Sequence, residues 1–265
     1  MSTSQETKDR SDRSQNGSAV YVYGIVPGDV EVEESAQGVC DPPVAVDIVH
    51  EGDIAALVSV ISTDCALGTP EDLQAHAKLL DGTARVAPVL PLRFGAVMTD
   101  EEAVAEELLR DHHDEFAQAL KALEGQAEYI VKGRYVEKAF LTRLLSENEQ
   151  AQQLAADIRD KSEDASRNSR IALGELISNA VEAMRETDTK AVIEELDGIA
   201  KQVNPRDPTH EWDAVHVALL GEVERQSELE ELLERLNENA DGRMQLRLLG
   251  PLAAYDFVVA GAAEG

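Results

Sequence analysis

One arginine lies alone in an apolar stretch of the chain, where a cationic side chain could bind an anionic group or polarise a substrate. It is Arg93, in the segment APVLPLRFG (residues 87–95). A buried guanidinium without a carboxylate or carbonyl partner is very costly, so this arginine should either pair with a neighbouring acid or lie where a partner binds. We favour the structural role at the end of a strand, place partner binding second, and consider catalysis the least supported.

Two histidine motifs contain residue types that could bind a metal, but neither has suitable spacing. His113, in the pair His112-His113, falls on the apolar face of the helix expected over residues 99–123, while the neighbouring carboxylates face elsewhere. We expect a core or boundary role for it. His210 and His216, in HEWDAVH, are six residues apart rather than the four of H-E-x-x-H, and the segment ends with strand-like alternation. We therefore predict no metal site and no cofactor.

The common catalytic and nucleotide-binding motifs do not occur in the sequence. It contains neither glycine-rich phosphate-binding pattern, G-x-x-x-x-G-K-[ST] or G-x-G-x-x-G, and no nucleophile elbow G-x-S-x-G. Paired carboxylates such as Glu101-Glu102 are expected on solvated helix faces. Cys40 and Cys65 form no C-x-x-C pair, so we expect both to be reduced and to pack as small apolar residues. No catalytic residue is assigned.

Composition and charge are those of an acidic, folded protein. The chain has 265 residues, a formal net charge of −28 and 43% hydrophobic residues, few of them aromatic. A negative charge of this size repels nucleic acids and anionic lipids. No stretch approaches the roughly 18 consecutive apolar residues of a membrane span. We expect no nucleic-acid partner, no membrane partner and a cytoplasmic location.

The first half of the chain predicts an antiparallel sheet covered by helices. The segment TPED (residues 69–72) is a strong helix start, because threonine caps, proline suits the first turn and the acids face the positive helix end. The prolines of residues 85–94 place that strand at an edge. Strands are expected at 19–26, 44–50, 54–61, 85–94 and 127–136, with helices starting at residues 70 and 99. This order favours an α+β fold with a ferredoxin-like N-terminal domain.

The second half predicts central long helices followed by a smaller α+β part. Helical periodicity covers residues 137–186, and the polar segment 160–170 indicates two helices rather than one. Further along we expect a turn at 187–189, a short helix at 192–199, a loop at 204–208, strands at 212–221, 243–250 and 254–261, and a helix at 227–239. The expected domains are a disordered tail (1–18), an N-terminal domain (19–136), a helical segment (137–187) and a C-terminal α+β domain (188–265).

Three segments, taken together and in order, resemble the signatures of one protein family. They are VYVYGIV near the start, VLPLRFGAVMTDEEAV in the middle and LRLLGPLAAYDFVV near the end. EGDIAALVSVIS and HAKLLDGTARVAPVLPLRFG agree in order and spacing. Over roughly residues 19–261 the chain is therefore similar to the gas vesicle protein F/L family (GvpF/GvpL). The ending Gly250–Val258 departs from the usual family residues, as do Arg134-Tyr135 and Glu137.

The resemblance implies a non-enzymatic role in gas vesicles, the gas-filled protein shells that give cells buoyancy. Family members contact the main shell protein, which is small, very apolar and prone to aggregate. They have a ferredoxin-like N-terminal domain followed by an α-helical and α+β part. We therefore expect an accessory or minor structural protein that binds the main shell protein, keeps it soluble or nucleates the shell, and works with other gas vesicle accessory proteins.

The family signatures also select individual residues. For partner binding through an exposed sheet edge or apolar groove, on the strands expected at 85–94 and 255–260, we select Pro91, Arg93, Phe94, Tyr255 and Phe257. For the structural motif we select Tyr23, Gly24, Leu92, Gly95, Gly250 and Pro251.

Two other classes of function stay open from the residues alone. An enzyme or small-molecule sensor on a ferredoxin-like domain would need a polar pocket with a shifted titratable group, and no spacing in the sequence indicates one. An acidic scaffold protein could instead dimerise through the helices at 137–186.

Overall fold

The chain forms two compact units in the computed structural model, which describes residues 17–33 and 35–258. The first unit contains the described residues up to Glu128 and those from Gly250 onward, and the second unit is Tyr129–Leu249. This division differs from the domain boundaries expected after residues 136 and 187. The described residues from Gly250 onward belong to the first unit and not to a separate C-terminal domain. The tail expected at residues 1–18 lies outside the described residues, apart from its last two.

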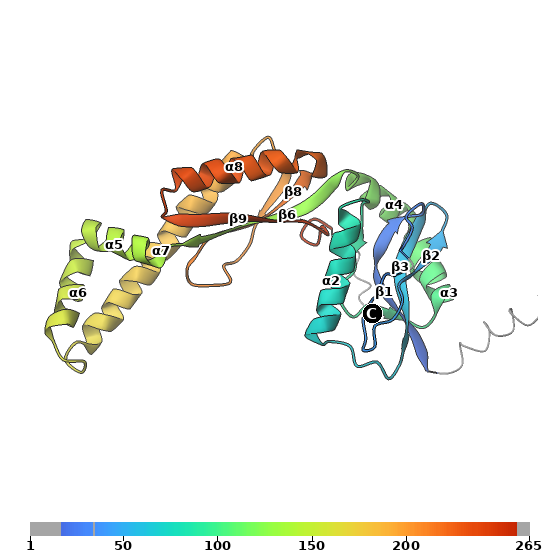
Figure 1. The fold of residues 1–265 in the computed structure, drawn as a ribbon, viewed down its shortest axis with the longest axis horizontal. Helices are drawn as coiled ribbons and strands as arrows, with labels where there is room; N and C mark the ends of the chain where they lie inside the picture. The colour runs from blue at the N-terminus through green and yellow to red at the C-terminus, as the bar shows by residue number, and fades with distance from the viewer. Residues whose placement is uncertain (1–16, 34, 259–265) are drawn as a thin grey trace, which may run out of the picture. The chain divides into compact units, whose positions relative to one another are not determined.

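The first unit is built on five short antiparallel strands (Figure 1). They are β1 (Ser18–Pro27), β2 (Asp47–Glu51), β3 (Ile54–Ser62), β4 (Leu90–Pro91) and β5 (Val97–Met98). Their order is β2-β3-β1-β4, and β5 also pairs with β1. The central strand β1 is an apolar run buried from Val20 to Val26, which a strand requires when both faces of its sheet are covered.

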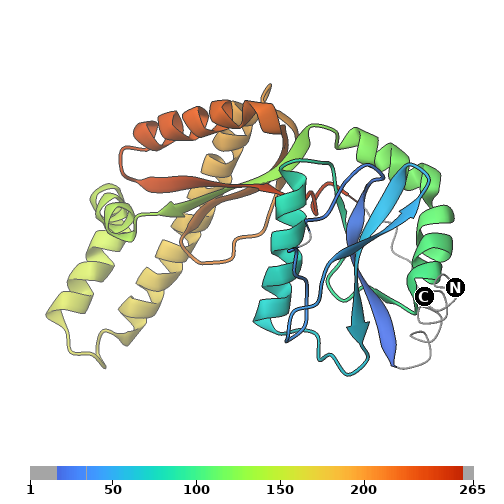
Figure 2. The ribbon, with the colours of Figure 1, turned by 45° about the vertical axis from the view of Figure 1, so that its right-hand side comes forward.

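Helices cover both faces of this sheet. Figure 2 shows α2 (Pro70–Ala84) on one side of the strands, and α3 (Glu101–Ala103), η2 (Val104–Arg110) and α4 (His113–Ala122) on the other. The expected start of α2 is confirmed, because Thr69 and Asp72 form a capping box with proline in the first turn. The single helix expected over residues 99–123 is instead a short α-turn, a π-helical segment and a separate helix.

The strand expected over residues 85–94 is much shorter than predicted. Only Leu90 and Pro91 pair with β1, through Ile25 and Gly24. The edge position is confirmed, since β4 ends the strand order. Proline has no N–H to donate, so Pro88 and Pro91 limit how far a hydrogen-bond ladder can extend through this segment.

The second unit has a four-stranded sheet and the longest helix among the described residues, α7 (Arg167–Leu196). Its elements are most of β6 (Gln126–Tyr135), α5 (Glu137–Glu147), α6 (Glu149–Asp160), α7, β7 (Ala200–Pro205), β8 (Asp213–Glu222), η3 (Val223–Arg225), α8 (Gln226–Asn239) and most of β9 (Met244–Leu252). The start of β6 and the end of β9 belong to the first unit. The strand order is β7-β8-β6-β9. In chain order both sheets therefore read second-third-first-fourth, an arrangement compatible with the ferredoxin-like expectation. The fold class is α+β, as expected.

Helix α7 is longer than the sequence indicates. The turn expected at residues 187–189 does not form, and the separate helix expected at 192–199 is the end of α7. Three polar residues that resemble a turn have partners instead: Thr187 Oγ1 donates to the Ala183 carbonyl, Thr189 to the Ala214 carbonyl, and Asp188 accepts from Tyr135. Strand β7 was not expected from the sequence, and it takes up the first part of the loop predicted at 204–208.

The C-terminal segment does not form the strand expected over residues 254–261. β9 ends at Leu252, and the backbone N–H groups of Phe257 and Val258 donate to the Ala254 carbonyl, which makes a local turn. Tyr255 and Phe257 therefore lie on this turn rather than on a sheet edge. Residues 259–261 lie outside the described part.

The expectation of two reduced cysteines is wrong. Cys40 and Cys65 form a disulfide, with their Cα atoms 5.9 Å apart. The loop after β1 returns to the start of α2, where the Cys40 N–H donates to Asp72 Oδ1 at 2.7 Å. Sequence spacing does not show this approach, because 25 residues separate the two cysteines.

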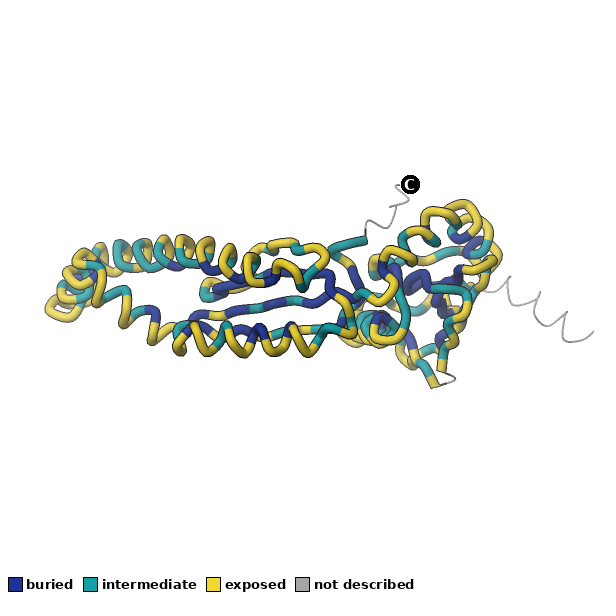
Figure 3. Tube along the Cα trace, turned by 90° about the horizontal axis from the view of Figure 1, so that it is seen from above, coloured by how far each residue is buried: buried dark blue, intermediate teal, exposed yellow. Residues whose placement is uncertain are grey.

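Buried residues follow the strands of both sheets, and exposed residues lie mainly along the helices (Figure 3). On α7 the apolar side chains of Leu173, Leu176, Ile177, Ala180 and Met184 are half-buried, and Val181 is buried. None of the helices in the described residues combines the length and apolar character needed to span a bilayer.

Candidate functional site

Side chains from all three family-like segments meet around one buried histidine in the first unit. We define the aromatic cluster as Tyr21, Tyr23, His76, Phe94 and Tyr255. Tyr21 and Tyr23 are fully buried on β1, and His76 is 3% exposed on α2. The ring centroids of Phe94 lie 5.6 Å from His76 and 5.9 Å from Tyr21, in edge-on geometries that aromatic pairs favour.

A chain of hydrogen bonds runs through the imidazole of His76. The Tyr21 hydroxyl lies 2.9 Å from Nδ1, and the Tyr255 hydroxyl lies 3.0 Å from Nε2. The Tyr21 oxygen also accepts from the Gly95 N–H at 3.2 Å. Nearby, the Tyr23 oxygen accepts from the Val39 N–H and lies 2.9 Å from Ser59 Oγ. The polar atoms of Tyr21, Tyr23 and His76 are therefore paired although these three side chains are buried.

Burial controls the charge state of this cluster. It lowers the pKa of His76 and raises the pKa of Tyr21 to about 12. It also raises the pKa of Tyr255. At neutral pH the imidazole and the two phenols are thus all uncharged. A neutral, enclosed imidazole between two phenols joins β1, α2 and the C-terminal segment, which is a packing role.

The glycines and apolar residues selected as a structural motif bring β1 and β4 together. A Cβ atom at Gly24 would lie 2.7 Å from the Leu90 carbonyl oxygen, so only glycine permits this approach. The Leu92 N–H donates to the Tyr23 carbonyl at 2.9 Å. Gly95 has a φ of +93°, which a residue with a side chain rarely adopts. These contacts explain the residue types of the middle segment without any catalytic role.

Hydrogen bonds from Ala253, Tyr255 and Asp256 hold the described C-terminal segment in the same unit. The Ala253 N–H donates to Asp81 Oδ1 at 3.0 Å, and the Asp256 N–H donates to Glu128 Oε2 at 2.9 Å. The third contact is the one from Tyr255 to His76. Gly250 begins the segment with a φ of +137°, and Pro251 beside it is buried.

The five residues selected for partner binding lie in different environments. Pro91 is buried, and Phe94 and Phe257 are half-buried. Tyr255 is 41% exposed, although its hydroxyl reaches His76. Arg93 is exposed and makes no ion pair or side-chain hydrogen bond with any residue that the structure describes. The structure therefore does not show the structural ion pair that we favoured for Arg93 within the described chain.

Neither His76 nor Tyr21 is among the residues selected individually from the sequence. A signal for His76 was present, because the buried residues of α2 follow a spacing of four: Asp72, His76, Leu80 and Ala84. Helical periodicity places such residues on one inward face. Neither the hydroxyl of Tyr255 nor the ring of Phe94 could be assigned to this histidine from local pattern.

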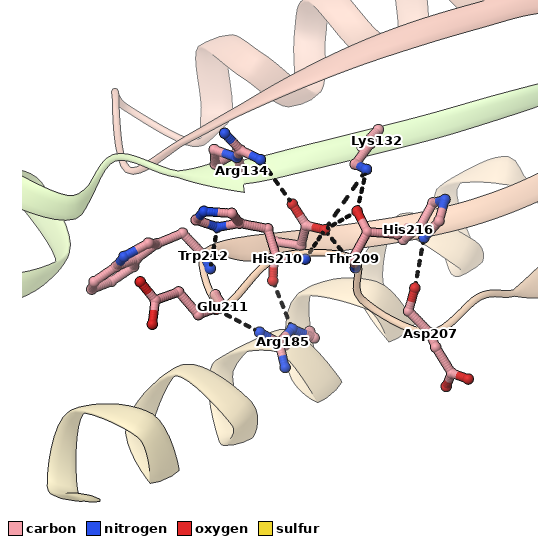
Figure 4. Close-up of polar contacts among 10 residues, drawn as sticks. Lys132, Arg134, Arg185, Asp207, Thr209, His210, Glu211, Trp212 and His216 are labelled. Carbon is pink, nitrogen blue, oxygen red and sulfur yellow. Dashed lines mark hydrogen bonds and ion pairs between the residues drawn. The ribbon is translucent and has the colours of Figure 1, made fainter. Parts of the chain in front are cut away.

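A second polar cluster in the second unit surrounds Asp213, which is 1% exposed. Figure 4 shows four residues of this cluster, Lys132, Arg134, Thr209 and His210. Its Oδ2 accepts from the backbone N–H groups of Thr209 and His210, at 2.8 and 2.9 Å. Lys132 and Arg134 approach the carboxylate at 3.8 and 3.6 Å. Burial disfavours the ionised form, but the Thr209 and His210 donors and the Lys132 charge outweigh it and hold the pKa of Asp213 below its usual value.

The histidines considered as metal ligands have other partners. His210 Nδ1 accepts from the Trp212 N–H, and His216 Nδ1 donates to the Asp207 carbonyl (Figure 4). His113 is half-buried and is the first residue of α4, and its Nε2 lies 2.7 Å from Asp53 Oδ1. It also lies 3.4 Å from Asp114 Oδ1, which corrects the expectation that this carboxylate faces away. Within the described parts of the chain, no three His, Cys, Asp or Glu side chains are arranged to hold a metal ion.

Comparison with known proteins finds a family match over the part of the chain that contains both the aromatic cluster and the polar cluster around Asp213. The family model described as "Gas vesicle synthesis protein GvpL/GvpF" matches residues 19–259. The chain belongs to the GvpL/GvpF family. Among relatives, Gas vesicle protein F of Streptomyces sp. (strain CB03234) is 31% identical over 91% of this chain and 99% of its own length. Gas vesicle protein F of Dolichospermum flosaquae is 27% identical over 90% and 96%.

Similarity to the L branch covers less of the family fold. Gas vesicle protein L of the same Streptomyces strain is 31% identical, over 42% of this chain and 46% of its own length. Among solved structures, GvpF from Anabaena sp. PCC7120 has a TM-score of 0.72 at 24% identity, over 90% of this chain and 97% of that one. That structure supports the α+β fold. The three family signatures of this chain therefore contribute aromatic side chains to the aromatic cluster around His76.

Proposed function

We propose that this protein is a non-enzymatic accessory protein of gas vesicle assembly that binds the apolar main shell protein and keeps it soluble or nucleates the shell. Membership of the GvpL/GvpF family over residues 19–259 is the observation that carries the proposal. The protein would work in the cytoplasm at the growing vesicle, with other gas vesicle accessory proteins. Its net charge of −28 would keep a complex with an apolar subunit in solution.

The segment after β4 supports a binding surface at this edge of the first sheet. β4 pairs with β1 only through Leu90 and Pro91, and β5 pairs with β1 again at Val97 and Met98, so Arg93 and Phe94 lie in the connection between two short edge strands. Arg93 is exposed and unpaired among the described residues, and Val97 on β5 is 44% exposed. A cation beside exposed apolar side chains can bind carbonyl or carboxylate groups of a partner while apolar surfaces pack. Phe94 supports the segment from inside, against His76.

The proposal is tested by co-purification of this chain with tagged shell protein. Arg93→Glu changes an exposed side chain and should leave the fold intact, and Arg235→Glu on α8 is the matched control with an equal change in charge. We expect Arg93→Glu to reduce capture about tenfold and Arg235→Glu to leave it unchanged. Unchanged capture by a folded Arg93→Glu protein removes this surface, and no capture by the unaltered chain contradicts the proposed function.

A further inference from the structure

A groove of about 830 Å³ lies in the first unit, away from the aromatic cluster. It is formed by the end of β1 and the residues after it, the β2–β3 turn, the segment before β4 and the helix α4. Ile54 and Leu120 in its wall are 1% and 4% exposed, so its base is part of the packed core. The volume falls within the range of about 300–1,000 Å³ that ligand-binding clefts occupy.

An apolar side chain stands at the mouth of this groove. Val86 is 86% exposed, more than any of the other large apolar side chains exposed in the described chain. Ala87 and Pro88 continue the same wall toward β4. Exposed apolar side chains beside a cleft are typical of surfaces that bind another molecule.

Carboxylates surround this apolar base. Asp29, Glu31, Asp53 and Glu124 line the groove, and Lys121 is the one lysine or arginine among the lining residues. Asp53 is close to His113, but Asp29, Glu31 and Glu124 are exposed and make no ion pair or side-chain hydrogen bond with the described residues. Like charges around a cleft repel one another. These three carboxylates therefore do not stabilise the fold through any polar contact with the described residues.

We propose that this groove binds a short segment of a partner protein in which apolar side chains alternate with lysine or arginine. The apolar side chains would pack against Ile54, Leu120 and Val86, and the cations would approach the three unpaired carboxylates. Opposite charge at the rim speeds association and selects against acidic segments. The inference goes beyond the proposed function, because it uses other residues than Arg93 and does not require the shell protein.

The test measures fluorescence anisotropy of a labelled peptide, KVKLKVK, added to the full chain. Any protein this acidic attracts cationic peptides. Matched variants are therefore needed to show that the peptide binds at the groove. Asp29→Asn/Glu31→Gln/Glu124→Gln removes three charges at the groove, and Glu231→Gln/Glu234→Gln/Glu238→Gln removes three exposed charges from α8. We expect the groove variant to weaken binding at least about tenfold, and the α8 variant by less than about twofold.

Two further measurements test the apolar half of the inference. The peptide KSKGKSK has the same charge without apolar side chains and should bind about tenfold more weakly. Val86→Ser should weaken KVKLKVK but not KSKGKSK. Slower amide exchange in residues 117–124 on adding KVKLKVK would support the location. Equal loss in the two triple variants, or equal binding of the two peptides, would overturn the proposal.

Discussion

The hydroxyl of Tyr255 lies 3.0 Å from Nε2 of His76, although 179 residues separate the two in the sequence. The contact joins the C-terminal segment to α2 in the first unit. It connects the last family signature to His76, the first residue of the family-like segment HAKLLDGTARVAPVLPLRFG. The contact is one hydrogen bond in a part-buried site, so its contribution to stability should be measurable but modest.

Tyr255→Phe should lower the free energy of unfolding by about 1 kcal/mol, because it removes the hydroxyl and leaves Nε2 of a buried imidazole without this partner. Urea unfolding followed by circular dichroism measures the change. Tyr129→Phe is the matched control: the Tyr129 hydroxyl is buried without a hydrogen-bond partner, so its removal should be neutral or stabilising. If both variants lose equal stability, the contact with His76 contributes nothing.

Stability should fall as the pH drops below about 6.5, the ordinary histidine pKa. Burial lowers the pKa of His76 in the folded state, so the unfolded chain binds this proton more readily. The contribution of His76 is therefore complete above the unfolded pKa and is lost as pH falls toward the folded pKa. Urea midpoints at pH 7.5 and 5.5 should differ less in His76→Gln than in the unaltered protein.

His113 provides the opposite control, because its partners Asp114 and Asp53 raise its pKa and together outweigh the effect of burial. This histidine stabilises the fold below its unfolded pKa, and the contribution disappears as pH rises through the folded pKa. His113→Gln should therefore steepen the loss of stability on acidification. A shallower loss in His113→Gln would show that this assignment of signs is wrong.

Removing the Cys40–Cys65 disulfide should destabilise the protein by about 3 kcal/mol, the amount expected for a cross-link spanning 25 residues. Thermal melts of Cys40→Ser/Cys65→Ser and of reduced protein should shift down together. Reductant should not shift the double variant further. A thiol assay on denatured, unreduced protein should find no free thiol, and two free thiols per chain would contradict the pairing.

Arg243→Ala should be far more damaging than Arg143→Ala. Arg243 Nη2 donates to Asp188 Oδ1 at 2.9 Å, and the side chains of this pair are 23% and 12% exposed. Without Arg243, the buried Asp188 carboxylate keeps the hydrogen bond from the Tyr135 hydroxyl but has lost its ion pair. We expect the free energy of unfolding to fall by about 3 kcal/mol. Arg143 pairs with Glu147 on an exposed helix face, where such pairs contribute below about 1 kcal/mol. Similar losses in both variants would contradict the buried pair.

The sequence by itself determined the elements that depend on neighbouring residues. β1 follows from an apolar β-branched run, β3 from the apolar segment at 54–61, and α2 from the capping box at Thr69. Alternation and periodicity also located β6, β8 and α8. Family signatures identified the family that comparison confirmed. These features are local, because a cap, a turn or a buried face is specified within a few residues.

The tertiary structure decided everything that depends on distant partners. Asp188 looks like a turn residue until Tyr135 and Arg243 hold it inside α7. Cys40 has no recognisable partner until the loop after β1 brings it to Cys65. His76 becomes the centre of the signatures only when Phe94 and Tyr255 reach it. Such contacts join segments tens to hundreds of residues apart, and packing and burial select them without leaving a spacing in the sequence.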